Sequence, residues 1–246
     1  KPQKASTEKS PYHAMILALD EYRDPWPQAH QIPKEELHGL TDTLRTTGLF
    51  PETHIKVLNG THATRTDIEE NLVTLAKHQL TPDSIFLLYY SGHAFVAPEN
   101  GEVYLVPYEG SPTASKKRLI SLRSLQRVLH KFKAKLTLLF LDTPVTQYLE
   151  ATGKVVKLNE STLTNWRAMI PVDGEASSTR MIQIRRVQGK SHRDPAQLLA
   201  GLLGGGDQNQ NGTVTVGELL KNLQGTAEII PPQTQYLPFA NIPLAQ

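Results

Sequence analysis

Residues 85–94 read IFLLYYSGHA, an unbroken apolar run that gives way abruptly to small residues and a histidine. A second run of this kind, LTLLFL at residues 136–141, ends at Asp142. Strands that are apolar on both faces are typical of the interior of a parallel sheet that helices cover on both sides. The two runs therefore predict two buried, central strands.

Shorter apolar runs and helical patterns alternate around these two strands. Further strands are expected at residues 14–19, 54–58 and 103–106. Leucines recur at helical spacing between the apolar runs, which predicts helices at residues 34–47, 66–79 and 121–130. Thr66 and Glu69 have the spacing of a capping box, so the second helix is expected to begin at Thr66. This alternation predicts an α/β fold, with a mostly parallel central sheet and helices on both faces.

The C-terminal third of the chain has a weaker pattern. Strands are expected at residues 168–172 and 181–187, and a helix is expected from Asp194, with Pro195 in its first turn. We predict one domain over residues 11–246, preceded by a polar linker or trimmed tail at residues 1–10.

The composition excludes several classes of protein. The sequence holds 26 Lys and Arg against 24 Asp and Glu, a net charge of +2, and this balance argues against a nucleic-acid partner. No apolar run approaches the roughly 20 residues of a membrane-spanning helix, so no membrane segment is expected in this chain. The sequence contains no cysteine, which rules out a disulfide, a thiolate metal site and a cysteine nucleophile. A cytoplasmic location and a periplasmic or extracellular one both fit a soluble chain without cysteine.

A functional site is expected where the two central strands end, because ligands of doubly wound sheets bind beyond the carboxyl ends of the strands. His93 follows the first strand on a turn of small residues, where an imidazole can act as a general base. The alternative is an ordinary histidine in a surface loop. Asp142 and Thr143 follow the second strand and are expected to lie beside His93.

Several segments, in this order and at this spacing, resemble the caspase, metacaspase and paracaspase superfamily, in particular bacterial caspase-like domains. The resemblance covers about residues 11–246 and rests on YHAMILALDEY (12–22), LHGLTDTL (37–44), IKVLNGTHATRTDIEENL (55–72), FLLYYSGHA (86–94), GEVYLVPYE (101–109), LLFLD (138–142) and LLAGLLGGGDQNQNGTVTVGELL (198–220). It implies the caspase-like three-layer form of the α/β fold.

In that family the histidine strand ends in Ser-Gly-His-Gly, the nucleophile strand ends in Asp-Ala-Cys, and the two side chains together cut peptide bonds. The resemblance makes His93 the retained catalytic histidine and places Pro144 at the position of the cysteine. Ala94 replaces the second glycine, and its Cβ is expected to crowd the backbone where a substrate approaches. The resemblance therefore implies a pseudoprotease that acts as a protein- or peptide-interaction or regulatory module.

Proline at this position removes two parts of the reaction at once. It has no nucleophilic atom to attack a carbonyl, and it has no backbone N–H to stabilise an oxyanion. Loss of one oxyanion donor alone costs about a hundred- to a thousandfold in rate. An alternative is a weak hydrolase in which His93 activates the hydroxyl of Thr143 or Thr146, although these threonines also fit ordinary turn positions.

Metacaspases and paracaspases hold an arginine or lysine of the substrate in an acidic pocket, and two aspartates of that pocket match Asp42 and Asp142. The resemblance implies that these carboxylates bind a basic segment through charge-assisted hydrogen bonds. Asp42 also fits a solvated helix position, and Asp142 also fits the cap of a turn. The expected partner is a protein or peptide, either a basic segment or an active caspase-like relative.

Residues 207–218, DQNQNGTVTVGE, match the template of a calcium-binding EF-hand loop. The ligands would be the side chains of Asp207, Asn209, Asn211 and Glu218 and the carbonyl of Thr213. Thr215 and Glu218 also have capping-box spacing, which explains the same residues without a metal. The sequence requires no cofactor, and calcium is the one cofactor for which it contains a matching motif. A calcium-responsive structural module is therefore the third functional hypothesis.

Overall fold

The computed structural model describes residues 10–24, 34–46, 48–97, 100–111, 115–143, 145–149, 154–157, 181–186, 201, 205–222, 227–230 and 243–245. The expected strand at residues 168–172 and the expected start of a helix at Asp194 lie outside these ranges.

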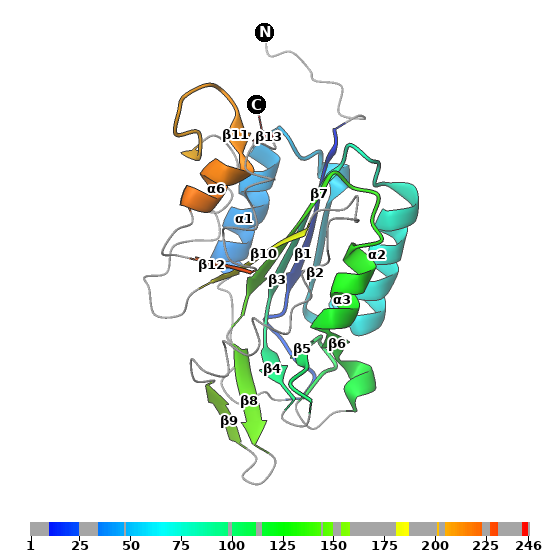
Figure 1. The fold of residues 1–246 in the computed structure, drawn as a ribbon. Helices are drawn as coiled ribbons and strands as arrows, with labels where there is room; N and C mark the ends of the chain where they lie inside the picture. Colours follow the sequence, from blue (N-terminus) through cyan, green and yellow to red (C-terminus); the bar gives the residue numbers. More distant parts are fainter. Residues whose placement is uncertain are drawn as a thin grey trace.

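The central feature is a sheet of six strands in the order β12-β10-β7-β3-β1-β2 (Figure 1). In chain order these strands are β1 (Tyr12–Ala18), β2 (Ile55–Asn59), β3 (Ile85–Ser91), β7 (Leu136–Asp142), β10 (Met181–Arg186) and β12 (Ala227–Ile230). All neighbours are parallel except β10 and β12, which are antiparallel. The two apolar runs form β3 and β7, which lie side by side at the centre. The predicted α/β fold with a mostly parallel sheet is confirmed.

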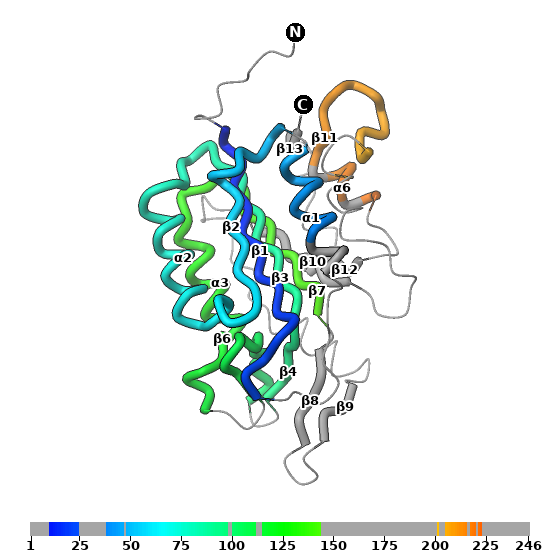
Figure 2. Tube along the Cα trace, turned by 180° about the vertical axis from the view of Figure 1, so that it is seen from behind, coloured from blue at the N-terminus to red at the C-terminus, as the bar shows by residue number. Residues whose placement is uncertain are grey.

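Helices cover both faces of this sheet, as Figures 1 and 2 show from opposite sides. On one face lie α1 (Lys34–Thr46) and α6 (Val216–Asn222), and on the other lie α2 (Arg65–His78) and α3 (Leu122–Leu129). The alternation of side chains along β1 divides the core between the two faces. Met15 packs with the leucines of α2 and α3, whereas Ile16 packs with Leu40 of α1 and Leu219 of α6. Burial of both faces explains why the central strands are apolar throughout.

The helix α2 begins one residue earlier than predicted, at Arg65, and its N-cap is Thr64. The Thr64 side chain accepts a hydrogen bond from the Asp67 N–H at 3.1 Å and donates one to the Asp67 carboxylate at 2.6 Å. The predicted capping box of Thr66 and Glu69 is therefore wrong, and Glu69 instead pairs with Arg65 at 2.6 Å.

A second sheet, in the order β6-β5-β4-β8-β9, lies beyond the carboxyl ends of the central strands (Figure 1). Its strands are β4 (Ala94–Val96), β5 (Val103–Leu105), β6 (Ile120–Ser121), β8 (Val145–Leu149) and β9 (Lys154–Lys157). Thr146, for which a turn position is one of the expectations, lies instead in the strand β8. A third, two-stranded sheet joins β11 (Val214–Thr215) to β13 (Pro243–Ala245). None of the helices in the described ranges combines the length and the apolar character that crossing a bilayer requires.

At the amino end of β1, two histidine rings stack. The ring centroids of His13 and His54 lie 4.1 Å apart, with 12° between the planes, and His54 Nδ1 lies 3.1 Å from the carbonyl oxygen of Tyr12. His13 is only 3% exposed, and its Nδ1 has no hydrogen-bond partner within the described structure. Burial, and secondarily the charge of His54, lower the pKa of His13 from 6.5 to about 4.

The stability of the fold is therefore expected to fall in mild acid. Between pH 6.5 and about pH 4 the unfolded chain binds a proton at His13 and the folded chain does not, so the free energy of unfolding decreases as the pH falls through this window. Between pH 7.5 and pH 5 the expected loss in the free energy of unfolding is about 2 kcal/mol, and urea unfolding at pH 7.5, 6 and 5 measures it. His13→Phe should remove this part of the pH dependence, whereas His78→Gln, at an exposed position, should keep it. The same pH slope in wild type and His13→Phe would refute this role.

Candidate functional site

The candidate site lies where β3 and β7 end. Ser91 is the register partner of Asp142 in the central sheet, and Ala94 is the register partner of Val145 in the second sheet. The short segment that contains His93 and the one that contains Pro144 therefore each connect the central sheet to the second sheet. The strands before the two segments pair with each other, and so do the strands after them. Pro144 itself lies outside the described residues.

His93 is held by its main chain from two sides. Its N–H donates to the Tyr22 hydroxyl at 2.8 Å, and its carbonyl oxygen accepts from the Tyr90 hydroxyl at 2.6 Å and from the Val106 N–H at 3.0 Å. The His93 and Tyr22 rings also contact each other, with centroids 5.2 Å apart. His93 is only 1% exposed, so the alternative of a histidine in an open surface loop is wrong.

The two tyrosines that hold His93 were not predicted from the sequence. Burial raises the pKa of both hydroxyls far above the ordinary value of 10, so Tyr22 and Tyr90 stay neutral hydrogen-bonding groups at any physiological pH. Tyr90 also accepts a hydrogen bond from the Val106 N–H at 3.1 Å, which ties the end of β3 to the end of β5. The tyrosines therefore fix the position of the turn after β3.

Gly92 is required by the close approach of these groups. A Cβ atom on Gly92 would lie 2.8 Å from the Tyr90 Oη, 2.9 Å from the Tyr22 Oη and 3.0 Å from the Cβ of Leu19. Contacts this short are not tolerated without movement of the neighbours.

Ala94, the residue after His93, starts β4 and pairs with Leu105 of β5. It is fully buried in the core cluster that also contains Tyr90 and Leu105. Its methyl group is therefore part of the core, contrary to the expectation that it would crowd an approaching substrate.

Asp142 ends β7 as a buried carboxylate, only 2% exposed. The Tyr89 hydroxyl donates a hydrogen bond to Asp142 Oδ2 at 2.6 Å, and the Tyr89 ring stacks on Phe140 with centroids 5.2 Å apart. Thr143, the next residue, is 4% exposed. Thr146 lies in β8 as the register partner of Phe95. A hydrogen-bonded buried carboxylate is the chemical group of this site that can recognise a cation.

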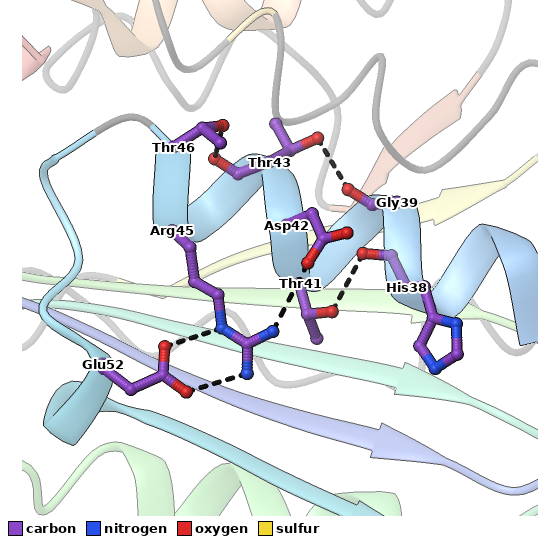
Figure 3. A network of polar contacts seen from close by, with 8 residues as sticks. All are labelled: His38, Gly39, Thr41, Asp42, Thr43, Arg45, Thr46 and Glu52. Carbon is purple, nitrogen blue, oxygen red and sulfur yellow. Dashed lines mark hydrogen bonds and ion pairs between the residues drawn. The ribbon is translucent and has the colours of Figure 1, made fainter.

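Asp42 lies elsewhere, on the exposed side of α1 (Figure 3). Its side chain is 68% exposed and forms an ion pair with Arg45, Nη1 to Oδ1, at 3.4 Å. Arg45 also donates to both carboxylate oxygens of Glu52, at 2.6 and 2.8 Å, and this contact lowers the pKa of Glu52. Glu52 lies three residues before the start of β2, whereas Asp142 stands at the carboxyl end of β7. The structure does not bring Asp42 and Asp142 together.

The predicted calcium ligands form a loop of their own. Asp207, Asn209, Asn211 and Thr213 precede β11, and Glu218 lies in α6. Figure 1 shows this loop at the opposite end of the molecule from β4 and β8. It is therefore separate from the site around His93.

Comparisons with known proteins identify the family. The model of the caspase domain family matches residues 12–180, which is more than half of the chain. A crystal structure of protein GSU0716 from Geobacter sulfurreducens has a similar fold, with a TM-score of 0.50 and 15% sequence identity over 89% of this chain and 91% of that chain. No curated protein matches the sequence significantly. The matched residues include both central strands, β3 and β7, and the chain belongs to the caspase domain family.

Proposed function

We propose that this caspase domain is a pseudoprotease, which binds a protein or peptide partner and does not cut it. The observation that carries the proposal is that the chain holds no cysteine, and the resemblance assigns the nucleophile position to Pro144. Peptide-bond cleavage by this family needs a thiolate that bonds to the carbonyl carbon and a donor for the resulting oxyanion. No residue of this chain supplies that thiolate.

The retained part of the site supports a binding role. Asp142 and its donor Tyr89 stand at the strand ends where ligands of such sheets bind. A guanidinium that reaches this buried carboxylate would form a charge-assisted hydrogen bond in a setting of low dielectric, where such bonds are strongest. We propose that the partner presents an arginine or lysine to Asp142. Asp42 is not included, because its carboxylate is directed to Arg45 on another part of the surface.

Calorimetry with a short peptide that ends in arginine tests this binding role. We expect Asp142→Asn to weaken binding at least about tenfold, the equivalent of about 1.4 kcal/mol, because it removes the charge that faces the guanidinium. Asp42→Asn is the matched control and should leave the affinity unchanged. A peptide with citrulline in place of arginine provides a test on the wild-type chain, and it should bind as weakly as the arginine peptide binds to Asp142→Asn. Equal affinity of wild type and Asp142→Asn for the arginine peptide would contradict the proposed site.

A further inference from the structure

Oxygen atoms converge in the loop at residues 207–212, because main-chain N–H groups hold them there. Asp207 accepts from the Asn211 N–H at 3.2 Å with one oxygen and from the Gly212 N–H at 2.8 Å with the other. Asn209 Oδ1 accepts from the Asn211 N–H at 3.0 Å, and Asn211 Oδ1 accepts from the Thr213 N–H at 2.9 Å. Each of these oxygens has a second lone pair that remains available to a cation.

The backbone curls tightly at two points to allow this convergence. Gly212 has a φ of 79° and Gln210 has a φ of 56°, and Gln210 is the one residue other than glycine with positive φ in the described part of the chain. A left-handed conformation at a glutamine is unfavourable without compensation. Gly212 occupies the sixth position of the loop, where calcium-binding EF-hand loops carry a glycine for their sharp turn.

Glu218 supplies an independent observation, because a capping role accounts for only one of its oxygens. Glu218 Oε2 accepts from the N–H and from the hydroxyl of Thr215, both at 2.9 Å, and the Glu218 N–H donates back to Thr215 at 3.3 Å. These bonds are the expected capping box. The other oxygen, Oε1, is buried and has no hydrogen-bond partner among the described residues. Glu218 as a whole is 7% exposed.

The Glu218 carboxylate faces the start of the loop, close to the N–H groups of Gln208 and Asn209. A buried carboxylate oxygen without a hydrogen-bond partner is costly, so a cation at this point would stabilise the fold.

We propose that residues 207–218 bind one calcium ion through side-chain oxygens of Asp207, Asn209, Asn211 and Glu218 and the main-chain carbonyl of Thr213. Amide, carbonyl and carboxylate oxygens are the hard ligands that calcium prefers. The described residues hold no group of three or more His, Asp and Glu side chains that could bind a metal, so the proposed site depends on the two asparagines and the carbonyl. With two carboxylates the expected dissociation constant is weak, about 0.1–1 mM, as in extracellular calcium modules.

Calcium binding should stabilise the whole fold, because α6 carries both Glu218 and the core residue Leu219, which is fully buried. The test compares the melting temperature of the full chain in chelator, in calcium and in the same concentration of magnesium, together with calorimetric titration of calcium. At ten times the dissociation constant, we expect calcium to raise the melting temperature by about 3–5 °C.

Glu218→Gln separates ligation from capping, because glutamine also forms capping boxes. This variant should lose the calcium response. Asp67→Asn is the control, since the Asp67 carboxylate likewise accepts from the hydroxyl of the threonine that caps its helix, Thr64, and this variant should keep the response. If Glu218→Gln does not fold, Asp207→Asn is the test variant. Its amide oxygen can still accept a hydrogen bond from the N–H groups of the turn, but it carries no charge to bind calcium. No calcium response in wild type, an equal response to magnesium, or an unchanged response in the folded loop variant would overturn the site.

Discussion

Replacement of Gly92 by alanine is expected to lower the free energy of unfolding by about 3 kcal/mol. The added methyl group would lie within 3.0 Å of the two tyrosine hydroxyls and of the Cβ of Leu19. Overpacking of a core typically costs 1–3 kcal/mol, and movement of the hydroxyls would also lengthen their hydrogen bonds to the His93 main chain. Both effects act on the same turn, so the total should exceed that of an ordinary alanine substitution.

Gly39→Ala is the matched control for this prediction. Gly39 lies inside α1, and a Cβ there would meet no atom within 4 Å. Alanine at such a helical position should stabilise the fold by about 0.5–1 kcal/mol. Urea unfolding monitored by circular dichroism measures both variants. A loss below about 1 kcal/mol for Gly92→Ala would show that the turn after β3 can relax, which the tight contacts of its neighbours argue against.

The central strands could be predicted because their side chains are apolar on both faces, a pattern typical of strands in a parallel sheet that is covered on both sides. The strands β4 and β8 could not, since three and five residues give little periodicity. Their pairing in parallel follows from where β3 and β7 end, which is a property of the assembled sheet. Short strands that depend on such pairing are set by tertiary context more than by local preference.

The start of α2 shows a different limit of prediction. Thr64 and Thr66 are each followed, three residues later, by an acidic residue, and only Thr66 and Glu69 have the residue types of a capping box. The structure selects Thr64, and the N–H of Arg65 then donates to the Glu109 carboxylate at 3.0 Å. Glu109 is 44 residues away along the chain, so no local pattern could reveal its contribution.

At the site, the sequence indicated the right strand ends for His93 and Asp142, because parallel strands bring their carboxyl ends to one edge. It gave no signal for Tyr22 or Tyr90, whose hydroxyls bind main-chain atoms and therefore leave no motif of paired side chains. Only the resemblance places Asp42 at the site, and in the structure its carboxylate pairs with Arg45.

The wild-type chain is expected to hydrolyse no peptide, and this is the largest functional effect that follows from its sequence. In the proposed assignment Pro144 occupies the nucleophile position, so the chain lacks both the attacking sulfur and one oxyanion donor of an active family member. The donor alone is worth about a hundred- to a thousandfold in rate, and the nucleophile is worth more. Thr143, whose hydroxyl the alternative of a weak hydrolase would use, is only 4% exposed.

The direct test is an assay with fluorogenic peptides that end in arginine or lysine, with calcium and with chelator, at enzyme concentrations high enough to detect very slow turnover. Wild type and His93→Ala should both give the rate of the buffer alone. Thermal melting confirms that the variant is folded, since the His93 main chain keeps its contacts when the ring is removed. A rate in wild type that His93→Ala abolishes would contradict the proposal that this caspase domain is a pseudoprotease.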